Sequence, residues 1–231
     1  MEIPSKRVFD VLKANGVESI YHANSVITAC QFLRASSLLS RGTVDRQRLY
    51  QTPQESDVID QNHGIWFDIF TDSVDIHHRA RRVNVYGPVL FVLDIQLIKR
   101  AYTGKVWVTK LNPTKWAGKR HEARWFVSAD DLKRNFVKGE FDHMVVFRHC
   151  GGELPFDGYL QEIILDDPQR KTPGNIDYYS MAYGALTLAK TEGEVSANVR
   201  RRKCPPGCSC VKSYQRDSQR TKVMFYPKSF E

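Results

Sequence analysis

One short stretch near the N-terminus, Tyr21-His22-Ala23-Asn24-Ser25, limits how this 231-residue chain can fold. The residues before it, Val17 to Tyr21, form a short run with Val, Ile and Tyr that predicts a strand. Apolar residues then recur at helical spacing, and Asn24 or Ser25 can cap that helix by accepting bonds from its free N–H groups. We therefore expect His22 at a strand end beside a helix N-terminus, a position at which small anionic ligands are often held.

Short predicted strands and helices follow one another through the rest of the chain. The strands are expected at residues 64–70, 83–86, 88–94, 105–109, 125–127, 143–148 and 159–165, and the helices at residues 5–14, 73–82, 95–102, 128–136 and 178–189. Residues 42–62 are polar without a sustained period and predict a long loop. The mixture predicts an α+β domain over residues 1–190, followed by a basic, turn-rich, cysteine-containing extension over residues 191–231.

The composition is that of an ordinary globular protein, with 42% hydrophobic and 26% charged residues. No apolar run approaches the roughly 18 residues of a membrane span, and the N-terminal residues lack the apolar stretch of a signal peptide. Five cysteines, an odd number in a chain of this size, do not predict a disulfide framework. We expect a cytoplasmic protein that does not contact a membrane.

The formal net charge of +8 favours a polyanionic partner, of which nucleic acid is the commonest. Basic residues gather in the last thirty or so positions, and a second basic cluster is interleaved with tryptophans. Phosphate-binding cations beside aromatic rings that stack on bases are what single-stranded nucleic acid requires, although core tryptophans and a solvated surface explain the same residues. The candidate contacts are Trp116, Lys119, Arg120, Arg124, Arg201 and Arg202.

Three cysteines close to one another, Cys204, Cys208 and Cys210, are near enough for their thiolates to share one metal ion. Structural zinc sites use four ligands, so the fourth must come from Cys150, His149 or another histidine brought close by folding. Without metal the stretch is an exposed cysteine-containing turn. Two adjacent histidines, His77 and His78, are followed by arginines in the sequence, and we expect this pair on a helix surface.

Several well-known catalytic signatures are missing from the sequence. The chain has no Walker-type phosphate loop, no G-x-G-x-x-G, no H-E-x-x-H and no G-x-S-x-G. These absences argue against a P-loop NTPase, a Rossmann dehydrogenase, a zincin metalloprotease and an ordinary esterase.

The order of the remaining features resembles a known family. A Tyr-His strand end is followed by a helix, an Arg-bearing polar segment, an apolar strand with a short helix, an acidic residue before another apolar strand, and Tyr-Leu-Gln-Glu-Ile-Ile-Leu at residues 159–165. Over residues 18–168 this order resembles the ADP-ribosyltransferase fold, and within it the DarT-type toxins that modify nucleic acid. The resemblance implies a split antiparallel or mixed β-sheet core with short flanking helices and the basic C-terminal extension.

The resemblance also implies a binding site for NAD as co-substrate. Tyr21 or His22 would hydrogen-bond the ribose or the nicotinamide amide, and an arginine would form a bidentate pair with the pyrophosphate. The candidate residues around NAD are Tyr21, His22, Ser25, Arg41, Arg46, Arg48 and Ser73, with Arg46 also grouped with the catalytic residues.

A carboxylate must stabilise the cationic ribose and help to deprotonate the acceptor. The DarT-type enzymes place a glutamate directly before an apolar strand, and Asp142, one methylene shorter, occupies that position here. Glu153, in a Gly-Gly loop that lets backbone approach a ligand, is the second candidate, and Glu140 is a further rival.

These expectations combine into one function with two alternatives. The first is transfer of ADP-ribose from NAD to RNA or single-stranded DNA, by a toxin of a bacterial toxin–antitoxin or phage-defence system that an antitoxin or regulatory protein controls. The second keeps the fold and transfers ADP-ribose to protein, or to water as an NAD glycohydrolase. The third is a non-catalytic nucleic-acid-binding module with the cysteines as a zinc knuckle.

Overall fold

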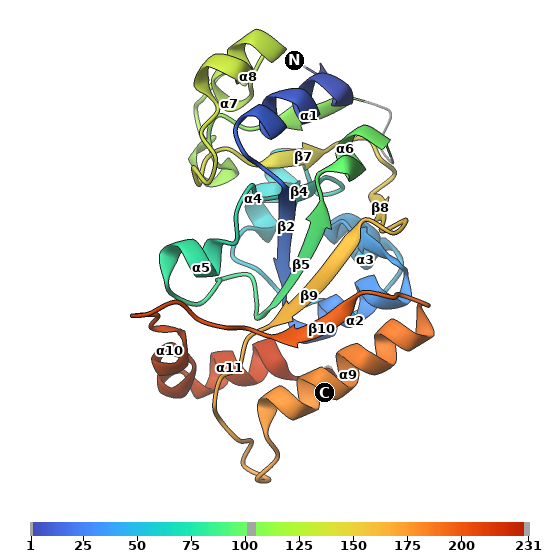
Figure 1. The fold of residues 1–231 in the computed structure, drawn as a ribbon, viewed down its shortest axis with the longest axis vertical. Coiled ribbons are helices and arrows are strands. Elements are labelled where there is room, and N and C mark those ends of the chain that lie inside the picture. The colour runs from blue at the N-terminus through green and yellow to red at the C-terminus, as the bar shows by residue number, and fades with distance from the viewer. Residues whose placement is uncertain (1, 101–104, 229–231) are drawn as a thin grey trace.

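Two four-stranded sheets meet edge to edge at the strand that carries His22 (Figure 1). The computed structural model describes residues 2–100 and 105–228. Strand β2 (Ser19–Asn24) forms one edge of the first sheet, and β4 (Ile69–Thr71) forms one edge of the second. An isolated antiparallel bridge joins Tyr21 to Asp72, with both backbone N–H···O distances under 3 Å (2.9 and 2.8 Å). Beyond this bridge the two strands separate, which leaves room for a site between the sheets.

The first sheet has the order β10-β9-β5-β2, the second has β1-β6-β7-β4, and a small third sheet pairs β3 with β8. The strands are β1 (Ile3–Pro4), β2 (Ser19–Asn24), β3 (Ser37–Leu39), β4 (Ile69–Thr71), β5 (Val89–Asp94), β6 (Lys105–Val108), β7 (Val145–Phe147), β8 (Glu153–Pro155), β9 (Leu160–Leu165) and β10 (Asn198–Arg201). All pairs are antiparallel except β9 with β10, which run parallel. The described residues therefore form an α+β protein, as the sequence predicts.

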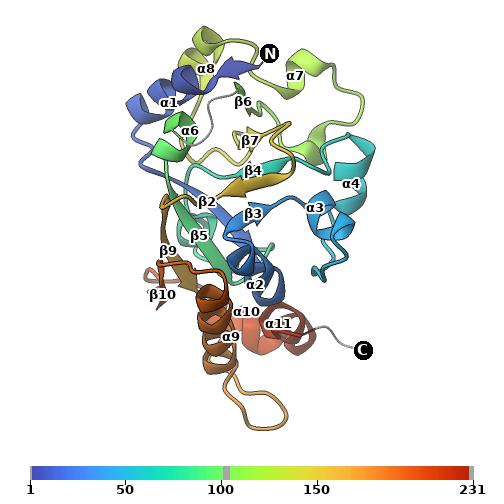
Figure 2. The same ribbon diagram turned by 90° about the vertical axis from the view of Figure 1, so that its right-hand side faces the viewer.

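The helices are short apart from α9. They are α1 (Ser5–Ala14), α2 (Val26–Arg34), α3 (Arg41–Arg46), α4 (Asp57–Asn62), α5 (Ile76–Ala80), α6 (Gln96–Arg100), the 3₁₀ turn η1 (Pro113–Lys115), α7 (His121–Arg124), α8 (Ala129–Asn135), α9 (Tyr178–Glu192), α10 (Cys210–Arg216) and α11 (Ser218–Phe225). Helices α2 and α9 pack against each other on one side of the first sheet (Figure 2). Helices α1, α6 and α8 lie together at the opposite end of the molecule (Figure 1).

The core follows from the alternation of side chains along β2, β5 and β9. Phe91 and Ile163 share a row with His22 and pack toward Phe32 of α2, where they join the main core. The neighbouring row, which contains Tyr21, faces the other side of the sheet and belongs to a smaller apolar cluster. Tyr21 and His22 therefore point to opposite faces of β2, although they are adjacent in sequence.

The C-terminal segment is more regular than the sequence indicates. The prediction of a turn-rich extension is wrong for residues 198–225, because β10 adds to the edge of the first sheet and α10 and α11 follow. Helix α11 packs on α2 and α9. Residues 198–201 have the sequence Asn-Val-Arg-Arg, and three of the four side chains are exposed. These residues form a strand because their backbone pairs with β9.

Other differences are local. The predicted long loop at residues 42–62 holds α3 and α4, and the side chain of Ser40 caps α3 by accepting a bond from Thr43 N. The predicted strand at 64–70 is limited to β4, residues 83–86 are not a strand, and residues 125–127 contribute an isolated bridge. Residues 101 and 102 of the helix predicted at 95–102 lie outside the described residues.

Gly87 shows how closely one turn approaches the strand end. Its φ is 151°, and a Cβ built there would lie 2.1 Å from the backbone of Asn24 and 2.3 Å from Ser25 N. No side chain fits that space without moving the start of α2. The turn therefore needs glycine at this position, and it places Tyr86 beside the opening between the two sheets.

Candidate functional site

A pocket with an empty volume of about 820 Å³, part of which is open solvent, lies where β2 and β4 separate. Three consecutive residues of β2 line it, with residues of β4, the start of α3, the α4 segment and the loop before η1. These lining residues include His22, Ala23, Asn24, Ser40, Arg41, Ser56, Asp60, Asp68, Phe70, Asp72, Tyr86 and Asn112. The pocket thus collects polar groups from segments that are distant in sequence.

His22 lines this pocket, and its ring carries a buried hydrogen-bond acceptor. Its Nδ1 lies 2.8 Å from the carbonyl oxygen of Phe70, and a carbonyl can only accept, so Nδ1 carries the proton. Burial lowers the pKa of His22, which keeps the ring neutral near pH 7. Nε2 then carries a lone pair, and it is buried with no partner among the described residues. A ligand hydroxyl or amide N–H would supply the missing donor.

Arg41, the first residue of α3, is the predicted arginine that lines the pocket. It is ion-paired with Asp57 and donates to Thr52 O at 2.9 Å, and its guanidinium lies 5.7 Å from the Trp66 ring centroid. Arg41 Nε is buried without a partner among the described residues. The Nε–H of this side chain is therefore available, while Nη1 and Nη2 each donate one bond.

Three carboxyl groups line the same pocket, and burial raises the pKa of each. The pKa of Asp60 rises to about 7, with the charge of Asp57 adding to the effect. The pKa of Asp68 rises to about 6, because burial outweighs the ion pair with Arg148. Burial and the charge of nearby Asp75 raise the pKa of Asp72 to about 7. Clustered carboxyls that titrate near neutrality are typical of active sites.

The other residues predicted to bind NAD are placed differently. Ser25 is fully buried and bonds to Thr28 and Thr52, so its hydroxyl supports the start of α2. Ser73 is also buried, and its hydroxyl accepts a bond from Gly139 N. Neither lines the pocket.

The remaining three candidates lie around the pocket rather than in it. Arg46 and Arg48 are exposed, and the guanidinium of Arg46 lies 5.5 Å from the Phe67 ring centroid. Neither arginine lines the pocket. Tyr21 is half-buried on the other face of β2, and burial raises the pKa of its phenol. Of the predicted residues around NAD, His22 and Arg41 are brought together.

The two predicted catalytic acids lie outside the pocket lining. Asp142 pairs with Lys115 at 2.7 Å and accepts a bond from Asn112 N at 3.0 Å, so it holds the loop before η1 in place. Glu153 is exposed on β8 and accepts a bond from Gln47 Nε2 at 3.1 Å. The rival Glu140 is also exposed.

A different glutamate shares a sheet row with Tyr21. Val92 of β5 pairs with Tyr21 on one side and with Glu162 of β9 on the other, which puts the Glu162 side chain on the Tyr21 face. Glu162 is half-buried and forms a bidentate pair with Arg200. Ala23, on that same face, also lines the pocket. Glu162 therefore lies on the face of the sheet opposite His22, and it does not line the pocket.

The predicted nucleic-acid contacts divide into buried and exposed groups. Trp116 is 1% exposed and packs against Trp125 with ring centroids 4.8 Å apart, so the interpretation that it stacks on bases is wrong for this conformation. The core alternative explains it. Lys119 and Arg120 are exposed beside it. Arg124 is half-buried, and its guanidinium lies 5.5 Å from the Trp116 ring centroid.

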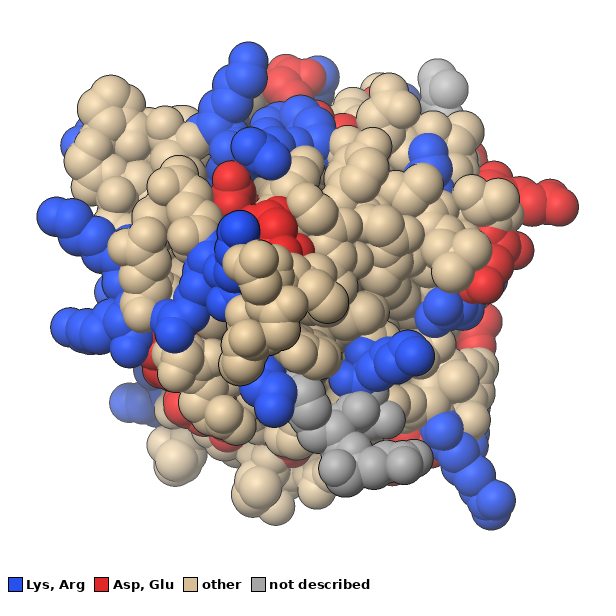
Figure 3. All heavy atoms as spheres, turned by 90° about the horizontal axis from the view of Figure 1, so that it is seen from below, with Lys and Arg blue, Asp and Glu red and all other residues tan. Residues whose placement is uncertain are grey.

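Two arginines of the C-terminal segment, both predicted to contact nucleic acid, also differ in their exposure to solvent. Arg201 is exposed and lies 4.1 Å from the Tyr179 ring centroid. Arg202 is buried between Asp75 and Asp166, with which it forms ion pairs, so it cannot meet a phosphate in this conformation. Figure 3 views the end of the molecule that carries α9, α10 and α11, where Lys and Arg form several separate groups rather than one continuous band.

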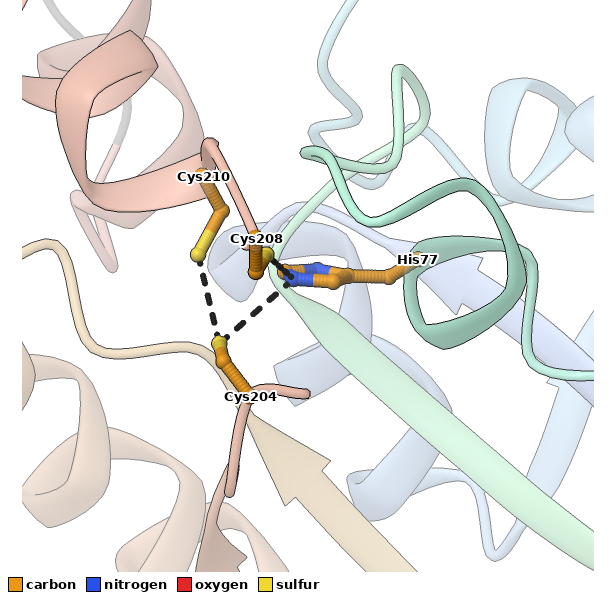
Figure 4. Close-up of side chains that lie close together, drawn as sticks. All are labelled: His77, Cys204, Cys208 and Cys210. Carbon is orange, nitrogen blue, oxygen red and sulfur yellow. Dashed lines mark hydrogen bonds between the residues drawn. The ribbon is translucent and has the colours of Figure 1, made fainter. Parts of the chain in front are cut away.

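The three C-terminal cysteines converge with His77 (Figure 4). One ligand atom from each of the four residues lies within 4.8 Å of the other three, and the group could hold a metal ion such as zinc. The predicted surface position of His77 is wrong, because the side chain is fully buried. Cys150 and His149 are not members of the group. His77 comes from α5, so the arrangement is not a local zinc knuckle.

Neither a protein-family model nor a curated protein matches this chain. Across the described residues, none of the helices has the length and apolar character needed to cross a bilayer. The site must therefore be interpreted from its own geometry.

Proposed function

We propose that this protein is an ADP-ribosyltransferase that uses NAD and modifies nucleic acid. The observation that carries the proposal is His22 Nε2, a buried acceptor without a partner at the end of a strand that lines a pocket. The resemblance assigns the histidine of this strand to a ribose hydroxyl or to the nicotinamide amide. Both groups are donors, so either one satisfies Nε2.

The acidity of the pocket supports the same ligand. The nicotinamide ring of NAD is cationic, and the ribose gains positive charge as the bond to nicotinamide breaks. Asp60, Asp68 and Asp72 surround the pocket with carboxyl groups, of which the ionised fraction stabilises positive charge in a partly desolvated space. Arg41 Nε, which is buried and has no partner among the described residues, would donate to a phosphate oxygen of this ligand.

In the transfer itself, the bond from ribose to nicotinamide breaks and nicotinamide leaves with the bonding electron pair. An acceptor oxygen or nitrogen forms the new bond to the ribose and loses a proton to a base. Asp72 is the carboxyl group that best fits this role, because it lines the pocket together with His22 and burial raises its pKa to about 7, close to the pH at which a base must take up the proton. Asp142 and Glu153 are tied to Lys115 and Gln47 at other places.

Charge supports nucleic acid as the acceptor. The chain carries a net charge of +8, and Lys119 and Arg120 are exposed. Such an activity harms the cell that makes it, so the proposal includes a role as a toxin in a toxin–antitoxin or phage-defence system, under the control of an antitoxin or regulatory protein.

The direct test is incubation of the purified full-length protein with labelled NAD and, separately, RNA, single-stranded DNA and bulk protein. We expect label on nucleic acid, a loss of at least about tenfold in Asp72→Asn, and near-normal transfer in Asp142→Asn and Glu153→Gln. Loss in Asp142→Asn or Glu153→Gln alone would return the catalytic role to the acid predicted from sequence. If none of the preparations consumes NAD, the proposal is excluded.

A double variant, Lys119→Ala with Arg120→Ala, separates the acceptor classes. Both side chains are exposed, so folding is unchanged and transfer to nucleic acid falls. Unaltered transfer to protein, or release of nicotinamide without a labelled acceptor, would favour the protein-modifying or glycohydrolase alternative. The alternative of a non-catalytic nucleic-acid module predicts binding that depends on salt and metal and no response to NAD.

A further inference from the structure

We propose that His77, Cys204, Cys208 and Cys210 bind one zinc ion that fastens the C-terminal segment to helix α5. The proposal rests on the geometry of these four side chains and their neighbours, and it does not depend on the proposed activity. Three kinds of observation carry it: the spacing of the ligand atoms, the group behind the histidine, and the segments that the site joins.

The spacing of the ligand atoms fits a tetrahedral ion. Cys204 Sγ lies 3.3 Å from Cys210 Sγ and 3.8 Å from His77 Nε2, and Cys208 Sγ lies 3.4 Å from the same nitrogen. Zinc bonds of about 2.0–2.3 Å give tetrahedral edges of roughly 3.3–3.8 Å. The sulfur atoms are too far apart for a disulfide, whose S–S bond is about 2.05 Å. Figure 4 shows the sulfurs and the ring nitrogen turned toward a common centre.

The ligand types select the metal. Three thiolates and one imidazole are soft ligands that suit zinc and disfavour magnesium or calcium, which prefer oxygen. Four protein ligands also complete the coordination of zinc and leave no open position for a catalytic water. The site is therefore structural in type.

A carboxylate behind the histidine orients it for this role. His77 Nδ1 lies 2.8 Å from Asp166 Oδ2, which fixes the proton on Nδ1 and directs the Nε2 lone pair toward the thiols. Tyr214 donates its hydroxyl to Asp166 at 2.7 Å, and Arg202 pairs with the same carboxylate. His77 and Asp166 are buried, so this arrangement is held rigidly. Zinc-bound histidines in proteins almost always have such a partner.

The site joins segments that are distant in sequence. His77 lies in α5, Cys204 follows β10, and Cys210 begins α10. The loop between these cysteines also docks on the end of α5, since Ser209 N donates to Arg81 O at 2.8 Å. Gly207, with φ of 75°, allows the loop to turn so that Cys208 reaches the same centre. Without the ion, the contact of Ser209 with Arg81 and the packing of α11 on α2 and α9 must hold α10 and α11 in place.

The test is the metal content of the full-length protein, purified under reducing conditions without chelator and measured by elemental analysis. We expect one zinc per chain. Each of the variants His77→Ala, Cys204→Ser, Cys208→Ser and Cys210→Ser should lose most of it. The matched controls Cys150→Ser and His78→Ala should keep it, because neither residue belongs to the group. Equal zinc in the ligand variants and the wild-type protein would overturn the proposal.

Two measurements on the wild-type chain keep the proposal testable where a variant fails to fold. Cobalt added after removal of zinc should give the visible bands of tetrahedral Co²⁺ and a thiolate charge-transfer band. Chelation should increase hydrogen exchange in residues 203–228 more than in α1 or α8. Absence of stoichiometric zinc together with an octahedral cobalt spectrum would overturn the metal site. An equal increase of hydrogen exchange in residues 203–228, α1 and α8 would overturn the role of the ion in fastening the C-terminal segment.

Discussion

The carboxyl groups of Asp60, Asp68 and Asp72 are the individual residues that most affect the chemistry of the pocket. Each is partly removed from water, and burial is the largest cause of its raised pKa. A buried carboxyl weakens the fold when it ionises, because its charge has lost hydration. Such residues are retained when they serve a ligand, since the ligand supplies the compensating charge.

Asp72→Asn should change how stability depends on pH. The folded carboxyl has a pKa of about 7, above its ordinary value of 3.8. Between these values the folded chain holds a proton that the unfolded chain has lost, so stability falls as pH rises from about 4 to about 7 and is then level. The asparagine removes this contribution, which is at most about 4 kcal/mol. Urea unfolding at about pH 5 and about pH 8 should show a smaller difference in the variant.

Asp45→Asn, at an exposed position, is the matched control and should leave the difference between the two pH values unchanged. An equal pH dependence in Asp72→Asn and the wild-type protein would show that Asp72 ionises normally in the folded state.

Sequence reasoning at this scale was limited to local signals. It predicted His22 at a strand end and offered Arg41 as one of three arginines implied by the resemblance, and both residues line the pocket. It could not place Asp60, Asp68 and Asp72 together, because they come from α4, the segment before β4, and the residue after β4. Trp116 was ambiguous, since an aromatic residue among basic ones has the same spacing whether it is buried or exposed.

At the scale of elements, the turn before β5 controls the start of α2. Gly87→Ala would place a Cβ within 2.1 Å of the Asn24 backbone at a φ of 151°. We expect a loss of about 1–3 kcal/mol or more in the free energy of unfolding, because either the turn or the strand end must move. Chemical denaturation measures this loss.

Gly184→Ala in the exposed middle of α9 is the control for that substitution. Nothing lies within 4 Å of its would-be Cβ, so alanine should be neutral or stabilising by up to about 1 kcal/mol. Equal stability of the Gly87→Ala and wild-type proteins would contradict the close approach of the turn to β2.

The helices and strands with the clearest apolar pattern were the ones whose positions could be predicted. β5, α1, α8 and α9 match their predicted positions closely, because each carries a clear period or cap. β10 has no apolar pattern and depends on β9 for its hydrogen bonds, so its own residues do not reveal it. The helices within residues 42–62 are single short turns of chain that tertiary contacts stabilise, which leaves a weak sequence signal.

At the scale of the whole molecule, the described residues form two four-stranded sheets and a small two-stranded sheet. A bridge between Tyr21 and Asp72 joins the two larger sheets, a pocket lies beside this bridge, and four residues that could hold a metal lie near the C-terminal segment. The α+β class followed from the alternation of predicted strands and helices. The convergence of His77 with Cys204 could not be predicted from the sequence, because the residues are 127 positions apart and no pattern links them. The cysteine spacing alone predicted three ligands and left the fourth open.

Binding of NAD to the pocket, measured by titration calorimetry at about pH 7.5, tests the central claim most directly. At this pH His22 is neutral and Nε2 can accept. We predict binding at one site per chain and a loss of about tenfold to hundredfold in affinity for His22→Ala, since a ligand donor would be left unpaired. His78→Ala, an exposed histidine, should bind as the wild-type protein does. No binding, or equal affinity in His22→Ala, would contradict the assignment of this pocket to NAD.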